Sequence, residues 1–468
     1  MANSILDVPS AEKRRDLASA SAASPQTVSR LWLIDLIWIS ALIAYILLGV
    51  PYTPFHGDES TLVYNTHDYA AQFIRRDPNV FDIGSGAVNP MDADLMLLDG
   101  RVHKYLGGLF WHLGGYSETE LNQPWLWGAD MAFNRENGHV PEDGLLSVTR
   151  LASAVLMAVG VPALFGIGLR LDGRFTAYAA TLLYTLAPAL LLNGRRSMME
   201  GSLMGFTLLT VLAALVFVRR RDVGSAALLG LSGGMALASK HTGLMPFGLV
   251  VGGIGLGLLV EVFIQKALPV RSLWRSAALL IISGLIAAGV FLAFNPAWWS
   301  DPLGTIGEVA VRRTALLENQ TAFFGGYSGW AERLQGFYRQ AVISVPQYYE
   351  ASPDWQAYIG DQIAAYEASL WKGLSAGIVA LVVLWPRGLW ALWQGIGSEN
   401  AEQRLVHWIA AVWIVGICAT VVLVTPLEWQ RYYLPAITAL CLLGGLGAGK
   451  LIKQSLTYIR QSRQSGTV

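Results

Sequence analysis

Residues 276–295, SAALLIISGLIAAGVFLAFN, are the stretch that decides the fold class, because they are apolar along their whole length and include no ionisable side chain. A helix of about 20 apolar residues crosses the roughly 30 Å hydrocarbon core of a bilayer, where irregular backbone would leave N–H and C=O groups unpaired. The stretch therefore predicts a transmembrane helix.

The rest of the chain repeats this pattern. Of its 468 residues, 53% are hydrophobic and 14% are charged, proportions that are typical of a membrane protein. The fifth apolar segment is short and rich in glycine, so we expect it to be tilted, broken or buried among its neighbours. We predict an all-α polytopic protein with about ten transmembrane helices, at residues 31–50, 149–170, 175–193, 198–218, 223–239, 243–264, 276–295, 369–386, 405–425 and 432–450.

The basic residues predict the orientation of these spans. An even number of spans puts both termini on one side of the membrane. If that side is the cytoplasm, every inner connection is basic, as the positive-inside rule requires. The residues concerned are Arg170, Arg174, Arg219, Arg220, Arg221, Lys266, Arg271, Arg275, Arg387, Arg404, Lys450, Lys453, Arg460 and Arg463.

This orientation gives one membrane domain, at residues 31–451, between cytoplasmic tails at residues 1–30 and 452–468. We expect it in the plasma membrane, with two long outer loops at residues 51–148 and 296–368. Both loops alternate aromatic and polar residues, which suits short amphipathic helices at the level of the lipid head groups. Because no small-residue cleavage site follows the first span, we expect an uncleaved helix and not a signal peptide.

Ionisable residues gather at the outer ends of four predicted spans. Asp58-Glu59 follows the first span; it is either a solvated helix end or a base placed to take a proton from a hydroxyl substrate. The stretch Arg195-Arg196-Ser-Met-Met-Glu200 precedes the fourth span. Its Arg196 and Glu200 have the spacing of a structural ion pair, but basic residues on an outer connection also indicate an anionic partner.

The other two groups lie on short outer turns. Lys240 either extends to the lipid head groups or faces a lipid phosphate as a point charge, and His241 beside it is better explained as a structural neighbour than as a metal ligand. Arg431 either pairs with Glu428 or uses its planar guanidinium on a phosphate, with Tyr432 next to it. The predicted topology brings all four groups to one membrane face, an arrangement expected for an anionic leaving group beside a catalytic base.

With these residues in view, the chain resembles the GT-C membrane glycosyltransferases, in particular the family 39 group of protein O-mannosyltransferases and lipid A aminoarabinose transferases. The resemblance spans most of the chain and implies a GT-C-like fold. The stretches that carry it are Asp58-Glu59, Arg196 through Glu200, Ala-Ser-Lys240-His-Thr-Gly-Leu, Asn295-Pro-Ala-Trp-Trp-Ser-Asp-Pro302 and Arg431-Tyr432-Tyr433-Leu-Pro435.

The resemblance implies a reaction and two classes of site residue. The family moves a monosaccharide from a polyprenyl phosphate donor to an acceptor on the outer side of the membrane, with inversion at the anomeric centre. Asp58 resembles the general base that deprotonates the acceptor hydroxyl, and Glu59 and Glu200 resemble residues that position the sugar or the acceptor. The donor phosphate would be held by Lys240, Arg196, Arg431 and Tyr432.

Four further residues are candidates for the same site, and some features depart from the family. Arg195 and His241 adjoin the phosphate candidates, and the stretch Arg101-Val-His103-Lys104-Tyr105 loosely resembles a proline-rich loop of the family. There are fewer spans than in many relatives, and we expect no soluble domain after the last one. These departures leave the acceptor, a protein, a glycan or a lipid, more open than the donor.

Other interpretations remain open from the sequence alone. A secondary transporter also buries charges among about ten spans, although its repeats and midplane charges are missing here. A non-catalytic membrane scaffold is a further alternative. No nucleic acid partner is expected. An acidic pair beside a phosphate often recruits a divalent metal, and no ligand spacing in the sequence decides whether one binds.

Overall fold

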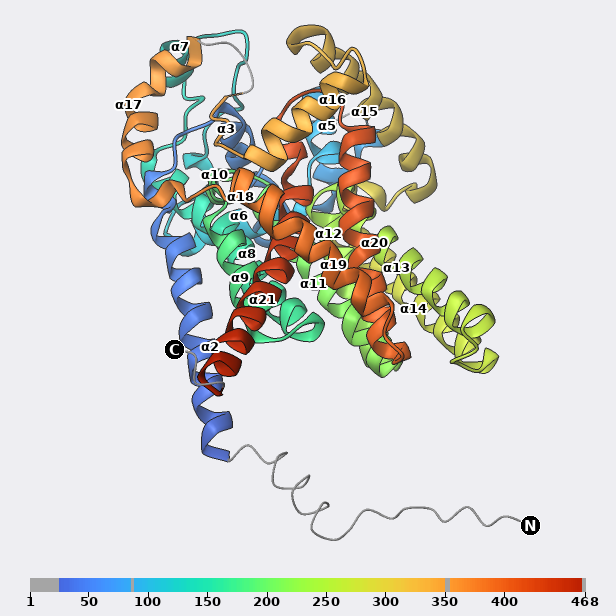
Figure 1. Cartoon of the computed structure of the whole chain (residues 1–468). Coiled ribbons are helices and arrows are strands. Elements are labelled where there is room, and N and C mark those ends of the chain that lie inside the picture. The colour runs from blue at the N-terminus through green and yellow to red at the C-terminus, as the bar shows by residue number, and fades with distance from the viewer. Residues whose placement is uncertain (1–24, 86–87, 350–353, 465–468) are drawn as a thin grey trace, which may run out of the picture.

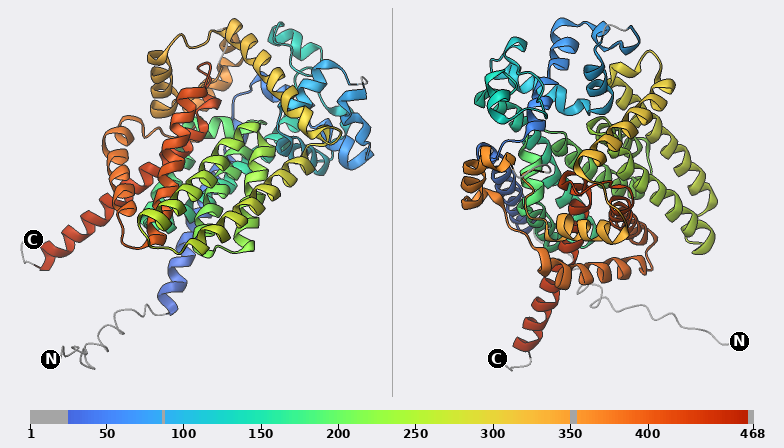
Figure 2. Two further views of the ribbon diagram at one scale, coloured as in Figure 1. Left: turned by 90° about the vertical axis from the view of Figure 1, so that its right-hand side faces the viewer. Right: turned by 90° about the horizontal axis from the view of Figure 1, so that it is seen from above.

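The structure is a computed structural model that describes residues 25–85, 88–349 and 354–464, and every regular element in these ranges is a helix (Figure 1). The predicted cytoplasmic tail therefore lies almost wholly outside the described residues. The predicted all-α polytopic architecture is confirmed. The described chain forms a bundle of long helices with a cap of short helices at one end (Figures 1 and 2).

Eight segments of the described chain are long and apolar enough to span a membrane. Each corresponds to one of the predicted spans. They are Leu31–Tyr52, which begins within α2 (Pro25–Leu48), Asp143–Leu171 (α8), Glu200–Arg220 (α11), His241–Ile264, which contains α13 (Leu244–Leu259), Val270–Phe294 (α14), Leu370–Ile396, which ends in α19 (Trp385–Ile396), Ala401–Val424 (α20) and Leu434–Gln464 (α21).

The remaining two predicted spans do not meet this criterion as single helices. The segment predicted at 175–193 is a bent pair, α9 (Arg174–Leu186) and α10 (Pro188–Arg195), whose axes differ by 61°. Pro188 explains the break, because it lacks an N–H and forces extended backbone on Ala187. The segment predicted at 223–239 is α12 (Val223–Ser239), which has 17 residues. The count of ten is thus not confirmed.

Two predicted boundaries need correction. Arg387 was predicted on an inner connection but lies inside the segment Leu370–Ile396, because α19 continues past it. The last helix continues well beyond residue 450, so Lys453 and Arg460, predicted in a tail, extend α21. Both errors arose because a hydropathy window stops at the first charges, although a helix continues through them.

Glycine allows the helices to pack closely in the middle of the bundle. A Cβ on Gly230 or Gly234 of α12 would overlap or press on the backbone of α14, and one on Gly445 of α21 would overlap Ala180 of α9. Small residues at such contacts let backbones approach and give membrane helices most of their packing energy. The resulting core is built largely by α8, α11, α20 and α21.

The two ends of the bundle differ in charge. At one end lie the basic residues of the predicted inner connections, in ion pairs such as Arg174 with Asp35, Lys453 with Asp172 and Arg404 with Glu261. The start of α2 and the end of α21 also lie there (Figure 1). We call it the basic end.

The two long loops form the cap at the opposite end (Figures 1 and 2). Gathering both loops at one end agrees with the predicted order of the spans. The helices of the cap are α3 (Gly57–Tyr64), α4 (His67–Tyr69), α5 (Pro90–Leu98), α6 (Arg101–Leu113), α7 (Met131–Glu136), α15 (Pro302–Phe324), α16 (Trp330–Phe337) and α17 (Asp354–Ala368).

Candidate functional site

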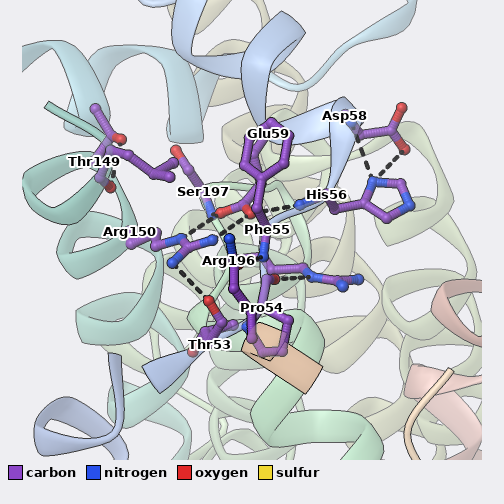
Figure 3. A network of polar contacts seen from close by, with 12 residues as sticks. Thr53, Pro54, Phe55, His56, Asp58, Glu59, Thr149, Arg150, Arg196 and Ser197 are labelled. Carbon is purple, nitrogen blue, oxygen red and sulfur yellow. Dashed lines mark hydrogen bonds and ion pairs between the residues drawn. The ribbon is translucent and has the colours of Figure 1, made fainter. Parts of the chain in front are cut away.

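The N-terminus of α3 orients the acidic pair. His56 precedes the helix in extended conformation; its Nδ1 accepts a hydrogen bond from the Asp58 N–H at 3.1 Å, and its own N–H donates to Glu59 Oε2 at 3.1 Å. This reciprocal capping satisfies two free donors of the first turn. It also turns the two carboxylates apart, so that Asp58 stays 19% exposed while Glu59 is completely buried (Figure 3).

Glu59 is held by the bundle beneath α3. Both oxygens accept from the guanidinium of Arg150 on α8, at 2.7 Å each, and Oε1 also accepts from the N–H of Ser197 at 2.8 Å (Figure 3). Burial alone raises the pKa of Glu59, but the charges of Arg150 and Arg196 more than offset this and hold the pKa below its usual range. Its contacts fit an anchor for α3 more closely than a substrate ligand.

Asp58 faces the last span instead. Arg431, from the turn before α21, donates to Asp58 Oδ2. The Arg431 guanidinium also lies 4.5 Å from the centre of the Trp429 ring, which stacks on Tyr432 at a centroid distance of 5.8 Å. Aromatic faces stabilise a nearby cation, so these rings help to hold Arg431 at the carboxylate.

A second ion pair continues the site toward the bundle. Glu200, the first residue of α11, accepts from Lys240 Nζ at 2.8 Å, and Lys240 ends α12. The Lys240 ammonium lies 5.8 Å from the centre of the Tyr432 ring. Tyr432 therefore contacts both cations, since Arg431 lies 5.9 Å from the same ring. We call Asp58, Glu200, Lys240, Arg431 and Tyr432 the outer charge cluster.

The outer charge cluster alternates acid and base. Its residues come from α3, from the start of α11, from the end of α12 and from the turn before α21, and the positions of Asp58 and Arg431 differ by 373 in the sequence. Each carboxylate pairs with one cation. One atom remains unused: Glu200 Oε2 is buried and has no hydrogen-bond partner among the described residues. A buried acceptor of this kind is costly unless a ligand or water reaches it.

Two predicted arginines lie outside this cluster. Arg195 is fully buried and donates to the carbonyl groups of Tyr45, Ile46 and Trp371, so it binds the end of the first span. Arg196 donates to the carbonyl groups of Pro54 and Tyr348, one in each outer loop.

The ion pair of Arg196 with Glu200, one of the two alternatives that the sequence left open, does not form. Arg196 follows the end of α10 in extended conformation, and α11 begins only at Glu200, so the two residues do not share a helix face. Because Arg195 and Arg196 are both satisfied by backbone carbonyl groups, their contacts favour structural roles.

The remaining predicted residues surround the cluster. His241 lies edge-on to Phe291 and Trp298, which fits the expected structural neighbour. Lys104 is buried and donates to Asp68 at 3.1 Å and to the Leu95 carbonyl at 2.8 Å. It thus belongs to a neighbouring ion network in the cap.

His103 is a buried residue of α6 that lies near the carboxylates of Glu200 and Glu59. Its Nε2 is 3.4 Å from the Ser197 hydroxyl, and its Nδ1 is buried with no partner among the described residues. Burial lowers the pKa of His103 to about 4, although the nearby carboxylates of Glu200 and Glu59 oppose this. His103 is therefore neutral at physiological pH.

Sequence reasoning missed Asp99, which follows α5. Its carboxylate accepts from Asn65 at 2.9 Å, and Gly100 packs so closely on the backbone before Lys240 that a Cβ there would overlap the Ser239 carbonyl. Burial raises the pKa of Asp99, Lys104 lowers it and the charge of Asp58 raises it further. The dipeptide Asp-Gly signals a turn but says nothing of what the turn contacts.

Arg150 was also missed. It lies in the second turn of α8, within the predicted span 149–170, and is almost completely buried. An arginine inside an apolar span was the available signal, because a cation there needs a partner. For metals, no group of three His, Cys, Asp or Glu side chains in the described ranges could hold an ion. We therefore assign no step to a metal.

Comparison with known sequences finds a similarity over part of the chain. Residues 102–297 match the family described as dolichyl-phosphate-mannose-protein mannosyltransferase. The matched region contains Glu200 and Lys240, whereas Asp58 and Arg431 lie outside it. No curated protein matches the chain.

Two solved structures illustrate the likeness in fold. The oligosaccharyltransferase of Archaeoglobus fulgidus in its apo form aligns over 92% of this chain and 52% of its own, with 11% identity and a TM-score of 0.50. ArnT of Cupriavidus metallidurans in the apo state aligns over 90% of this chain and 60% of its own, with 14% identity and a TM-score of 0.47. The chain thus spans little more than half the length of these proteins, and the likeness concerns the fold.

Proposed function

Because residues 102–297 match the mannosyltransferase family and the described chain has a GT-C-like fold, we propose that this protein is a membrane glycosyltransferase that uses a polyprenyl phosphate sugar donor. It transfers the monosaccharide to an acceptor hydroxyl at the cap end of the bundle, on the extracytoplasmic face, with inversion. The contact that supports this most directly is the placement of Tyr432 against both Lys240 and Arg431, with Asp58 on Arg431.

The two cations are suited to the donor phosphate. Lysine and arginine are the usual phosphate ligands, and the Arg431 guanidinium can bind two oxygens at once. Both residues stand at helix ends beside an aromatic ring, so little reorganisation is needed when charge develops on the leaving phosphate. When the donor binds, Lys240 and Arg431 each exchange a contact with a carboxylate, Glu200 or Asp58, for a contact with the donor phosphate.

Asp58 is suited to the acceptor. In the proposed step the carboxylate takes the proton of the acceptor hydroxyl, the hydroxyl oxygen bonds to the anomeric carbon, and the bond between that carbon and the phosphate oxygen breaks. The polyprenyl phosphate leaves with the electron pair and remains in the membrane. A donor that draws Arg431 toward its phosphate also releases Asp58, so the donor binds before the base is available.

The test is transfer from lipid-linked donors. The full chain in detergent is supplied with a panel of labelled polyprenyl phosphate sugars and with a membrane extract as acceptor source, and wild type is compared with Asp58→Asn. Transfer of label from one donor by wild type, lost in the variant, supports the proposal. Retained turnover in Asp58→Asn would remove Asp58 as the base, and no transfer from any donor would contradict the enzyme class.

The same assay tests whether transfer requires a divalent metal. Loss of transfer on adding a chelator, restored by one divalent ion, would establish that requirement. A sealed-vesicle uptake assay with the donor addresses the transporter alternative, which predicts accumulation without any new glycosidic bond.

A further inference from the structure

A polar cavity of about 210 Å³ opens at the basic end of the bundle, on the side opposite to the outer charge cluster. Its wall comes from the end of α8, from α19 and the turn after it, from the first turns of α20 and from α21. The residues that matter below are Asp172, Gln394, Ser398, Gln403, His407 and Lys450. At roughly 30 Å³ per water molecule, it has room for a small polar ligand.

The helices around this cavity are closely packed. A Cβ on Gly395 of α19 would overlap the ring of His407 on α20, and a Cβ on Gly449 of α21 would overlap the Thr176 hydroxyl of α9. The helices around the cavity are thus in direct contact.

The carboxylate and the neighbouring backbone carbonyl groups of the cavity wall are already used. Asp172 accepts from Lys453 at 2.9 Å and from the Thr176 hydroxyl at 3.0 Å. The carbonyl groups after α19 are taken by Arg404, which donates to Ser398 O at 2.7 Å and to Glu399 O at 2.9 Å.

Three donor groups of the cavity have no hydrogen-bond partner among the described residues. Lys450 Nζ lies 3.8 Å from Asp172, beyond hydrogen-bond distance, and makes no hydrogen bond to any described residue. The same holds for the side-chain NH₂ groups of Gln394 and Gln403 in the described part of the chain. Lys450 and Lys453 together exceed the single charge of Asp172, so the surroundings are cationic and rich in donors.

We propose that this cavity binds an oxyanion, namely the phosphate of a phospholipid head group or of a small phosphate compound. An ammonium group and two side-chain amides from three helices line the cavity and provide donors, while the Asp172 carboxylate beside them is engaged by Lys453 and Thr176. Donors of this kind bind phosphate oxygens. Basic pockets between transmembrane helices at a charged membrane face are typical sites for anionic head groups. The site is separate from the proposed transferase site and does not depend on that proposal.

The experiment uses the full chain and two probes. Inorganic phosphate is titrated in detergent, and phosphatidylglycerol is compared with phosphatidylcholine in nanodiscs, with the unfolding temperature and the lipids retained in native mass spectrometry as readouts. Lys450→Gln removes the ammonium, and Gln394→Leu removes an amide without changing the charge. Arg271→Gln is the matched control, because Arg271 is a basic residue at the same end on α14, outside the cavity.

We expect apparent affinity for one of the probes to fall roughly tenfold in Lys450→Gln, and by less in Gln394→Leu, since a hydrogen bond to a charged group contributes more than a neutral one. Arg271→Gln should bind as wild type does. Stabilisation by phosphatidylglycerol alone identifies a lipid head group, and stabilisation by inorganic phosphate alone identifies a soluble ligand. No stabilisation by either, or equal stabilisation of wild type and Lys450→Gln, would overturn the proposal.

Discussion

Asp58 and Glu59 are neighbours in the chain but occupy opposite environments, and this difference separates a chemical from a structural role. Asp58→Asn removes the proposed base while keeping the shape of the side chain. Sugar transfer should fall by roughly 10²- to 10⁴-fold, the usual contribution of a general base. The unfolding temperature should change little, because the carboxylate is partly exposed.

Glu59→Gln is the matched comparison. It leaves the Arg150 guanidinium buried without its countercharge, a loss that typically costs about 3–5 kcal/mol of stability. We expect a clear drop in unfolding temperature, with loss of activity only in proportion to unfolded protein. A Glu59→Gln variant that is fully stable but inactive would show that Glu59 acts on the substrate instead.

Lys240 needs a double variant, because its resting partner is buried. Lys240→Met should weaken apparent donor affinity by roughly ten- to a hundredfold through loss of one charged phosphate contact, and it should also destabilise the protein by leaving Glu200 unpaired. Adding Glu200→Gln removes the stranded charge and should restore the unfolding temperature but not the donor affinity. Wild-type donor affinity in the double variant would contradict the phosphate role.

His103 gives a pH dependence. Its pKa of about 4 lies below the usual 6.5, so the unfolded chain binds the proton more readily. The stability that this provides is complete above about pH 6.5 and decreases as the pH falls toward 4, by up to about 3 kcal/mol. His103→Gln should flatten the fall in unfolding temperature between pH 7 and 4.5. His112→Gln, at an exposed position, should keep the wild-type slope.

At the scale of elements, the join between α5 and α6 positions the Lys240 turn. A Cβ on Gly100 would overlap the Ser239 carbonyl, so Gly100→Ala must displace one of the two segments at a cost of about 1–3 kcal/mol. We expect weaker donor binding together with a lower unfolding temperature. Gly128→Ala, where nothing lies within 4 Å of the new Cβ, should leave both unchanged.

The elements also show what the sequence could predict. The spans follow from apolar length, and α12 has the predicted boundaries because Asp222 and Lys240 limit it. The bend between α9 and α10 had a local signal in Pro188, which hydropathy averages away. The structural roles of Arg195 and Arg196 had none, because their partners are backbone carbonyl groups that are distant in the sequence, and such contacts exist only after the chain has folded.

At the scale of the whole molecule, the prediction that mattered was the pairing of distant helix ends. Counting spans and basic connections predicted that Asp58, Glu200, Lys240 and Arg431 share one end, and their contacts confirm that they do. The count of spans could not predict which acid pairs with which base. A pair between Arg431 and Glu428 was one of the two alternatives for Arg431, but Glu428 instead accepts from Arg339 at 2.7 Å.

The orientation in the membrane can be tested with a membrane-impermeant thiol reagent. Thr119→Cys places a label in the cap, and Glu399→Cys places one between α19 and α20 at the basic end; both positions are exposed. In intact cells we expect labelling at 119 only, and labelling at 399 after permeabilisation. Labelling of both positions before permeabilisation, or of 399 alone, would contradict an extracytoplasmic cap.

The alternation of carboxylates and cations at the cap end governs how a substrate finds the protein. Since the opposing charges are already matched, the outer charge cluster projects little field past one Debye length, and long-range attraction of dissolved anions is weak. A lipid-borne donor would instead arrive by lateral diffusion within the leaflet. Turnover should then follow the surface density of the donor in the bilayer and respond little to ionic strength.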